Sequence, residues 1–449
     1  MNGDTITAIA TPIGQGGISI IRLSGPDAFS IAARIFSRNV DQMPSHTAKL
    51  GTITDEVGTA LDQVLLLAFR DGRSYTGDDT VEIHCHGGLF ITKKILALVL
   101  RSGARLAEPG EFTLRAFRNG KIDLVQAEAV QDLIGAKNDA ALKAAGADLQ
   151  GRLSDEVQAL QRSIIGHMAL IEAHIDYPEE GLEQNSYHEM IGALQETIAA
   201  LDKLEKSFHD GKKLRHTPQV ALIGRPNVGK SSLMNALLEK ERAIVTAIAG
   251  TTRDVIEEAC LIGGFEFSLV DTAGLRDTDE VIEREGIRRS LETMENADLV
   301  LLVLDATTPF SAEEKILLER CDSEKTLVVI NKIDAAPPPP PFEFETETVT
   351  VSARNKTGMD SLKKAITNRL TTGSGGYDEV VLTKERHFHA VQRAKVDLSH
   401  ALELLSCSSD YDLIAIEMRA GANALSSIIG MNITEELLSA IFSKFCVGK

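Results

Sequence analysis

The 449-residue chain is poor in cysteine and in positive charge, and it contains no long apolar run. Its five cysteines are odd in number and scattered, and no two form a C-x-x-C pair, which argues against a disulfide framework and against a paired-cysteine metal site. The N-terminus lacks a basic region followed by an apolar stretch, so no secretory signal is expected. No apolar run approaches the roughly 18 residues of a membrane span. We therefore expect a cytoplasmic protein that has no membrane partner.

Lysine and arginine total 47 against 65 aspartates and glutamates, which gives a net charge of −18. A free-standing nucleic-acid binder usually has a basic excess, because neutralising phosphates supplies most of its affinity. The deficit is uneven: residues 1–120 carry equal numbers of basic and acidic side chains, and the acidic excess belongs to residues 121–449. A role with RNA therefore requires a local basic patch or a second protein that brings positive charge.

The pattern of residues along the chain predicts four segments. Residues 1–120 mix short β-rich runs with turns, which indicates an α+β domain. Residues 121–216 are rich in alanine, leucine and glutamate and predict helices, with a single break at 176–186. Alternating strands and helices over 217–371 predict a doubly wound α/β unit. Helical spacing returns at 372–449, so we expect one discontinuous helical domain that the α/β unit interrupts.

Two short stretches predict connections rather than regular structure. Thr371–Gly376 (TTGSGG) has the composition of a flexible linker. Five consecutive prolines at 337–341 predict a stiff extended segment, and we interpret it as a surface loop inside the α/β unit.

The strongest motif is Gly224–Ser231 (GRPNVGKS), which fits G-x-x-x-x-G-K-[ST] between a predicted strand and a predicted helix. Its glycines let the backbone N–H groups point at phosphate oxygens. Lys230 would supply positive charge to the β- and γ-phosphates, and Ser231 would offer a hydroxyl to Mg²⁺. A glycine-rich turn that matches by chance is the alternative, which the strand and helix on either side disfavour.

Three further elements follow in order, each after a predicted strand: Asp271–Gly274 (DTAG), Asn331–Asp334 (NKID) and Ser352–Arg354 (SAR). The aspartate of DTAG would hold Mg²⁺ through water, and its glycine N–H would face the γ-phosphate. Asp334 can accept two hydrogen bonds from guanine N1–H and N2–H₂, and adenine has no such pair of donors. Each string is weak evidence alone, but the four in this order predict a guanine-nucleotide site.

Two features depart from the commonest arrangement of small GTPases. Leu275 follows DTAG, where a glutamine often orients the attacking water, and an apolar side chain cannot do this. Asn227, together with the segment 246–254 (TAIAGTTRD), could hold a monovalent cation beside the phosphates and neutralise charge there. The alternative is that Asn227 only ties the phosphate loop together.

Several longer strings carry a resemblance to a known family: ATPIGQGGISIIRLSG near the start, EIHCHGG at 82–88, PGEFTLRAFRNGKIDLVQAEAV at 109–130, AGTTRD, and the terminal Cys446–Lys449 (CVGK). With them the sequence resembles the MnmE (TrmE) family of tRNA-modification GTPases over essentially its whole length. The resemblance implies an N-terminal α+β domain that binds folate and forms dimers, a discontinuous all-α domain, and an inserted α/β P-loop GTPase domain. It also implies a homodimer whose GTP hydrolysis is stimulated by K⁺ and by contact between the two GTPase domains.

The resemblance assigns roles to individual residues. It implies that Glu283 orients the attacking water through a second water, and that Ser231 and Thr252 bind Mg²⁺. From the residues themselves we add Lys230 and Cys446 as catalytic candidates. The K⁺ ligands that the resemblance implies are Asn227, Thr246, Ile248 and Thr251. The folate ligands that it implies are Arg22, Glu82, Lys121 and Lys449. The residues expected at the nucleotide are Asn227, Val228, Gly229, Lys230, Ser231, Ser232, Thr246, Ala247, Ile248, Ala249, Gly250, Thr251, Thr252, Asp271, Thr272, Ala273, Gly274, Asn331, Lys332, Asp334, Ser352, Ala353 and Arg354.

The family task that the resemblance implies is the addition of an aminomethyl or carboxymethylaminomethyl group to carbon 5 of the wobble uridine of certain tRNAs. The one-carbon donor would be a tetrahydrofolate derivative, the 5-formyl or methylene form. The partner would be the flavoprotein MnmG (GidA), which carries the FAD and makes much of the tRNA contact. Two other readings stay open: a GTP-binding switch of ribosome assembly without folate chemistry, and a one-carbon enzyme in which the GTPase domain is only regulatory.

Some of these residues have simpler interpretations. His84 and His86 share one face of a strand while Cys85 points to the other, so satisfied histidines at a turn are expected rather than a zinc site. Cys446 could be a nucleophile if its pKa were lowered. We favour a supporting role for this thiol over a covalent one. Each charged folate candidate, taken alone, would more often be a solvated surface residue.

Overall fold

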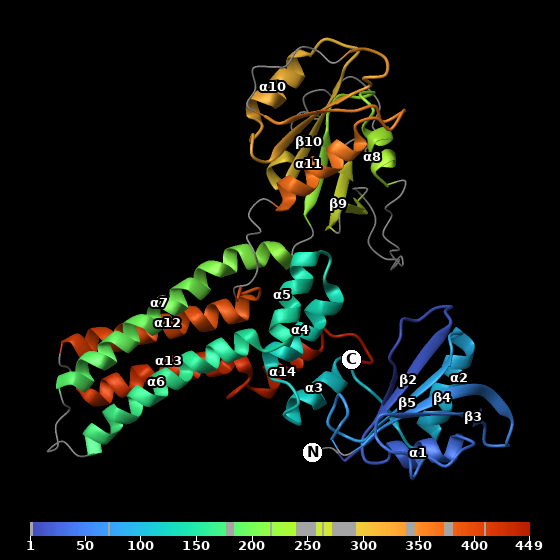
Figure 1. Cartoon of the computed structure of the whole chain (residues 1–449), viewed down its shortest axis with the longest axis vertical. Helices are drawn as coiled ribbons and strands as arrows, with labels where there is room; N and C mark the ends of the chain where they lie inside the picture. The colour runs from blue at the N-terminus through green and yellow to red at the C-terminus, as the bar shows by residue number, and fades with distance from the viewer. Residues whose placement is uncertain are drawn as a thin grey trace. The chain divides into compact units, whose positions relative to one another are not determined.

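The computed structural model describes residues 3–70, 72–176, 184–215, 218–238, 257–262, 265–271, 293–337, 346–371, 380–407 and 410–449 (Figure 1). The chain divides into two compact units. The first unit consists of Met1–Ile134, Ala145–Glu205 and Glu385–Lys449, and the second of Gly135–Ala144 and Lys206–Lys384. No helix of the described segments is both long enough and apolar enough to cross a lipid bilayer.

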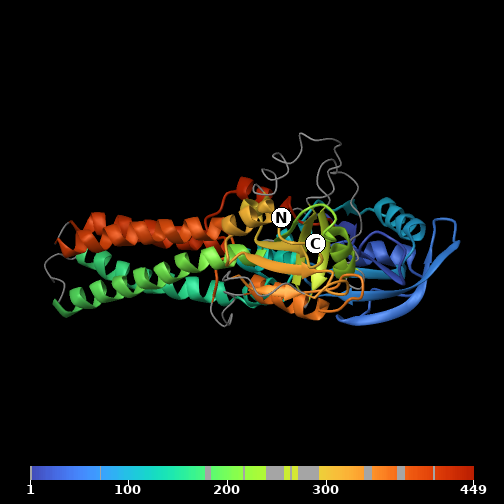
Figure 2. The ribbon, with the colours of Figure 1, turned by 90° about the horizontal axis from the view of Figure 1, so that it is seen from above.

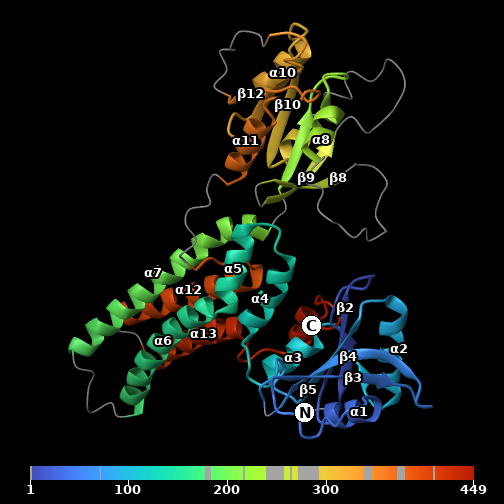
Figure 3. The same cartoon turned by 45° about the vertical axis from the view of Figure 1, so that its right-hand side comes forward.

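The N-terminal part of the first unit is a six-stranded mixed sheet in the order β3-β4-β5-β2-β1-β6. Alternate residues of its strands are apolar, so one face is buried, and α1 and α2 pack on that face (Figure 3). The opposite face carries the other residues of the same strands, among them Arg22 of β2 and Glu82 of β5. The bounds are β1 (Ile6–Ile9), β2 (Ile18–Ser24), α1 (Ala28–Ile35), β3 (Thr47–Thr54), β4 (Ala60–Phe69), β5 (Thr80–His86), α2 (Leu89–Arg101) and β6 (Arg105–Leu106).

Helices from both ends of the chain pack together in the first unit. Figures 1 and 2 show the long helices α6 and α7, from before the inserted α/β unit, side by side with α12 and α13, from after it. Lys395 joins the halves by donating to Asp202 and Glu205, at 2.5 and 2.7 Å. The bounds are α3 (Glu111–Arg118), α4 (Leu124–Gly135), α5 (Asp139–Leu149), α6 (Arg152–Asp176), α7 (Gln184–Arg215), α12 (Glu385–Ser406), α13 (Tyr411–Ile429) and α14 (Glu435–Phe442).

The helices predicted over 121–216 and 372–449 are confirmed, and their helical spacing buries Ile164 and Ile171 of α6 and Val391 and Leu398 of α12. The prediction of a single break at 176–186 is wrong. The helices also break at 136–138 and at 150–151. At the first break, the side chain of Asn138 accepts a hydrogen bond from the amide N–H of Ala141 in α5. Asn138 caps the start of α5 and Gly151 has φ +88°, so single residues set these breaks, although alanine and leucine continue on both sides of them.

The second unit contains a doubly wound sheet in the order β12-β11-β10-β7-β9-β8, parallel except for β8. The central strands β7, β10 and β11 are buried on both faces, with α8 and α11 packing on one face and α10 on the other. This confirms the α/β fold class expected from the alternation of strands and helices. The bounds are β7 (Gln219–Ile223), α8 (Lys230–Leu238), β8 (Glu257–Ile262), β9 (Phe265–Asp271), β10 (Leu299–Asp305), α10 (Ala312–Arg320), β11 (Thr326–Asn331), β12 (Thr348–Thr350) and α11 (Met359–Thr371).

Candidate functional site

The phosphate loop lies between β7 and α8, where the backbone makes turns that few residues other than glycine can adopt. Gly224 has φ +151°, and a Cβ there would lie 2.3 Å from the carbonyl oxygen of Val303. Gly229 has φ +96°, and its Cβ would lie 2.4 Å from the side-chain nitrogen of Asn331. Both positions require glycine because the chain passes so close to its neighbours. The backbone geometry therefore explains why the motif has glycine at these two positions.

Lys230 is buried at the start of α8 and lies against this loop. Its Nζ donates to the carbonyl oxygens of Gly224 and Arg225, at 2.5 and 2.9 Å. The ammonium group thus lies beside the N-terminus of α8, and both favour a bound anion. This is the position from which it can meet a phosphate.

The NKID and SAR loops join the phosphate loop through Asn331, at the end of β11. The buried side chain of Asn331 donates to Val228 O at 3.0 Å and accepts from the amide N–H of Ala353 at 3.1 Å. The hydroxyl of Ser352 donates to Asp334 Oδ1 at 2.7 Å. Asp334 itself is exposed, so its carboxylate is open to a base that lies over it. Three motifs meet at one edge of the sheet, although Val228 and Asn331 are 103 residues apart in sequence and Asn331 and Ala353 are 22 apart.

Asp305 is a residue of this site that the sequence reasoning missed. It ends β10, and its Oδ2 accepts from Lys332 Nζ at 2.6 Å, while the same Nζ donates to Asn227 O at 2.7 Å. Burial would raise the pKa of Asp305, but hydrogen bonds from Lys332 and Thr307 outweigh burial and hold the pKa below its usual value. Its position directly after a buried strand, like that of Asn331, was the signal that could have found it.

Many predicted residues of the nucleotide site lie outside the described residues. Asp271 ends β9 opposite Leu222, and its side chain is not described. Glu283 is among the predicted residues outside the described ranges, as are Thr246, Ala247, Ile248, Ala249, Gly250, Thr251, Thr252, Thr272, Ala273 and Gly274. The proline run, of which only Pro337 is described, and most of the TTGSGG stretch fall outside as well.

A second site lies in the first unit, on the sheet face away from α1 and α2. Arg22 of β2 and Glu82 of β5 are directly opposite in register, and Arg22 Nε donates to Glu82 Oε1 at 2.8 Å. Glu82 Oε2 lies 3.2 Å from His84 Nε2, and the Arg22 guanidinium carbon lies 5.6 Å from the centre of the Phe112 ring. Both charged side chains are largely buried, so this is a built pair rather than a solvated surface contact.

The C-terminal tail reaches the same place. Arg22 Nη1 donates to the carbonyl oxygen of Gly448 at 3.4 Å, which brings Lys449 next to the pair. Gly448 has φ +97°, and a Cβ there would lie 2.5 Å from Ile9 O, so the tail packs closely on the end of β1. Cys446 is exposed, and its carbonyl oxygen accepts from the amide N–H of Gly110. Lys121 instead donates to Gly72 O at 2.9 Å, in the loop before β5.

The histidines of the HCH string have carboxylate partners of their own. His84 contacts Glu82, and His86 Nδ1 lies 2.6 Å from Asp62 Oδ1. Cys85 points to the other face, where it is buried beside Thr92. In the part of the chain that the structure describes, no three His, Cys, Asp or Glu side chains gather as a metal site would require.

Comparisons with known proteins cover the whole chain. A family model described as "GTP-binding protein TrmE N-terminus" matches residues 5–121, and one described as "MnmE helical domain" matches residues 124–446. The tRNA modification GTPase MnmE of Protochlamydia amoebophila is 47% identical, over 100% of this chain and 98% of that protein. The tRNA modification GTPase MnmE of Syntrophotalea carbinolica is 42% identical over 100% of both. Among solved structures, the G domain of the FeoB iron transporter of T. maritima is 29% identical and covers 34% of this chain and 99% of that one, with a TM-score of 0.25.

Proposed function

Since the chain belongs to the MnmE family of tRNA modification GTPases, we propose that it couples the hydrolysis of GTP to the modification of tRNA. The observation that carries the GTPase part is the position of Asn331, whose side chain ties the phosphate loop to the SAR loop beside the guanine-reading Asp334. We further propose that the modified position is carbon 5 of the wobble uridine, with addition of an aminomethyl or carboxymethylaminomethyl group. We also propose that the protein acts in the cytoplasm, where tRNA is available to it.

For the hydrolysis itself we propose that Ser231 and Thr252 hold Mg²⁺ and that Glu283 orients the attacking water. K⁺ would be held by Asn227 with the segment 246–251 and would neutralise charge between the β- and γ-phosphates. Asn227 has φ +67°, a left-handed conformation that asparagine adopts more readily than most residues, so asparagine suits this turn of the phosphate loop as well as the proposed K⁺ site. Its carbonyl is anchored by Lys332, which leaves the side chain to act independently of that bond.

For the first unit we propose a tetrahydrofolate site at the Arg22–Glu82 pair, with Lys121 and Lys449 near it. The donor set fits such a ligand: a carboxylate accepts hydrogen bonds from the amino and ring N–H groups of a pterin, and cations suit its glutamate carboxylates. When bound, the 5-formyl or methylene form supplies the one-carbon unit. The side chain of Glu82 would orient the pterin, and Arg22 and His84 would hold Glu82 in place. Cys446, exposed beside the tail, would support the site.

For partners we propose a homodimer that acts with the flavoprotein MnmG, which would carry FAD and most of the tRNA contact. The acidic net charge of −18 favours a second protein as the main contact to RNA. The open face of the N-terminal sheet supports a dimer, because it exposes Ile18, Leu50 and Leu65. The corresponding domain boundaries would be 1–120, 121–216, 217–371 and 372–449.

The first test compares GTP turnover in KCl and in NaCl of equal ionic strength. We expect faster turnover in KCl, and an Asn227→Ala variant should lose the difference. Equal rates in the two salts would contradict the potassium site. The second test replaces the chain in cells by a Glu283→Ala variant and measures wobble-uridine modification by mass spectrometry. Normal GTP turnover by this variant would refute the role of Glu283, and unchanged modification would show that hydrolysis is not required.

A ribosome-assembly switch without folate chemistry is the alternative. Binding of 5-formyltetrahydrofolate to the full chain distinguishes the two, since only the proposed function requires it. The Glu82→Gln variant is the matched control, because it keeps the shape of the side chain and loses the charge that pairs with Arg22.

A further inference from the structure

The loop of residues 72–79, which joins β4 to β5, has more internal support than a surface connection requires. Four buried hydroxyl groups bond one another at its base: Ser24 with Thr76 at 2.7 Å, Thr80 with Ser24 at 3.1 Å, and Ser74 with Thr76 at 3.3 Å. Because the chain enters β5 at Thr80, opposite Ser24, the loop ends two residues before Glu82. Because the loop is constrained in this way, the positions of its side chains are fixed as well.

Helix α3 and the turn after it hold the same loop from the outside. Asn119 donates to Thr76 O at 2.8 Å and to Asp78 Oδ1 at 3.1 Å. Arg115, one helical turn earlier, forms an ion pair with Asp78 at 3.8 Å, and Lys121 donates to Gly72 O at 2.9 Å. These three residues belong to the string PGEFTLRAFRNGK, so much of that string serves to hold this loop.

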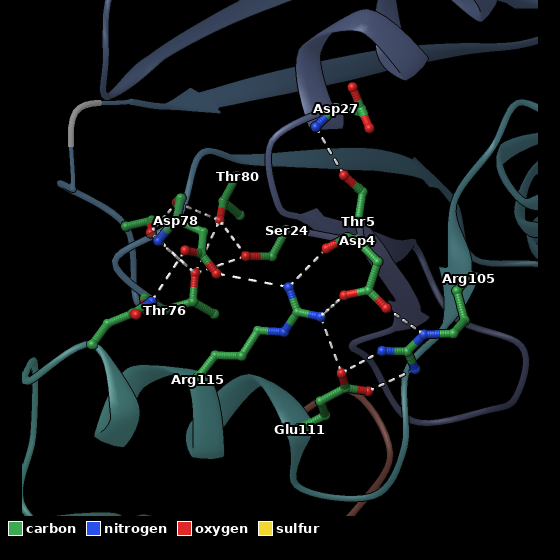
Figure 4. Close-up of polar contacts among 12 residues, drawn as sticks. Asp4, Thr5, Ser24, Asp27, Thr76, Asp78, Thr80, Arg105, Glu111 and Arg115 are labelled. Atoms are coloured by element: carbon green, nitrogen blue, oxygen red, sulfur yellow. Dashed lines mark hydrogen bonds and ion pairs between the residues drawn. The ribbon is translucent and has the colours of Figure 1, made fainter. Parts of the chain in front are cut away.

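Arg115 is in turn fixed by a network of charges, which Figure 4 shows. Its guanidinium group donates to the main-chain and side-chain oxygens of Asp4, at 3.0 and 2.8 Å, and to Glu111 at 3.1 Å. Arg105 bonds the same two carboxylates from the other side. Hydrogen bonds from Arg105 and Arg115 outweigh burial and hold the pKa of Glu111 below its usual value, so the network is charged at neutral pH.

Tyr75 is the large side chain that this loop presents. Its hydroxyl is 3.0 Å from Thr113 Oγ1, and Thr113 is fully buried in α3 beside Phe112, the ring that lies under Arg22. Burial raises the pKa of the Tyr75 phenol, against the opposing effects of Thr113 and of the positive charge of Arg22. The residue is nonetheless 37% exposed, so its hydroxyl is held by Thr113 while another part of the side chain is accessible to solvent.

We propose that Tyr75 forms a wall of the Arg22–Glu82 site and that its ring packs against the flat heteroaromatic part of the ligand, with Thr113 and the α3 network positioning the ring. This rests on the proposed folate site. An aromatic face beside a hydrogen-bonding carboxylate is what a pterin requires, because its rings stack while its edge bonds. The phenol oxygen bonds Thr113, so the ring rather than the hydroxyl contributes to binding.

The test measures binding of 5-formyltetrahydrofolate to the full chain by calorimetry. We expect Tyr75→Phe to bind within about twofold of the wild type and Tyr75→Leu to bind roughly tenfold more weakly, as loss of an aromatic contact predicts. Thr113→Val should bind like Tyr75→Phe, because both variants keep the ring and remove the same hydrogen bond. Tyr411→Leu, which removes a tyrosine from α13, is the matched control and should bind as the wild type does. Equal affinity of Tyr75→Leu and wild type would overturn the proposal.

A measurement on the unmodified protein guards against a Tyr75→Leu variant that fails to fold. Tetranitromethane nitrates accessible tyrosines, and mass spectrometry then follows Tyr75 and Tyr411 separately. We expect the ligand to slow nitration of Tyr75 several-fold and to leave Tyr411 unchanged. Equal nitration of Tyr75 with and without bound ligand would overturn the proposal. If the wild type binds no folate, the proposed function fails; if Glu82→Gln weakens binding and Tyr75→Leu does not, only the role of Tyr75 fails.

Discussion

Replacing Arg225 in the phosphate loop should destabilise the sheet edge that carries the nucleotide site. Arg225 Nε donates to Glu314 Oε1 at 2.8 Å, and Glu314 is 0% exposed. The other oxygen of Glu314 accepts from the amide N–H of Ser311 in a capping box at the start of α10. An Arg225→Ala variant would therefore leave a buried carboxylate whose charge has lost its partner.

The magnitude follows from this burial. Breaking a buried ion pair costs about 3–5 kcal/mol when one charge stays behind. Because the Arg225 side chain is 29% exposed, water already screens part of the interaction, and we expect about 1–3 kcal/mol. The double variant Arg225→Ala with Glu314→Gln should recover most of the loss, since glutamine carries no charge and still accepts from Ser311.

The assay is hydrogen exchange of the full chain, followed in peptides of β10 and α10. A loss of 1–3 kcal/mol corresponds to roughly 5- to 150-fold faster exchange where local opening controls the rate. We expect this acceleration in Arg225→Ala and a much smaller one in the double variant. If the two variants exchange equally fast, the reasoning from an uncompensated buried charge is wrong.

Three further predictions concern other parts of the chain. Gly229→Ala should lower affinity for GDP at least tenfold, because the new Cβ would lie 2.4 Å from Asn331 Nδ2; equilibrium binding of a fluorescent GDP checks this. Gly448→Ala should release the tail, since its Cβ would lie 2.5 Å from Ile9 O; faster removal of the last residue by carboxypeptidase checks this. Glu111→Gln should lower stability at pH 7 by about 1–3 kcal/mol. Because the folded pKa of Glu111 is lowered, its contribution to stability is complete above the unfolded pKa of 4.5 and is lost as the pH falls through the folded pKa. Urea unfolding should therefore show a difference in unfolding free energy between wild type and variant that narrows below pH 4.5.

The two glycine variants share a control. A Cβ at Gly146 in α5 would meet no atom within 4 Å, so Gly146→Ala should leave both GDP affinity and carboxypeptidase digestion unchanged. An effect of this variant as large as that of Gly229→Ala or Gly448→Ala would show that the measured losses are not specific to close packing. For Glu111→Gln, a difference in unfolding free energy from the wild type that stays constant down to pH 3 would contradict the lowered pKa.

Much of the fold could be predicted because its signals are local. Helical spacing of apolar residues predicted the helices of 121–216 and 372–449, and alternating strand and helix patterns predicted the sheet within 217–371. The helix breaks at 136–138 and 150–151 were missed because the composition does not change there; the breaks depend on capping by Asn138 and on a positive φ at Gly151. Such features involve single residues, which a periodic pattern averages out.

The sequence by itself predicted the chemistry of both sites, because residue types at fixed spacing indicate a phosphate loop and an aspartate suited to guanine, and longer strings carry a likeness to a family. Only the tertiary structure decided which distant residues meet. It brought Asp305 onto Lys332, Gly448 onto Arg22, and Tyr75 onto Thr113 of α3. The physical reason is that strand register and the packing of the chain ends are set by contacts between segments far apart in the sequence, which no local pattern encodes.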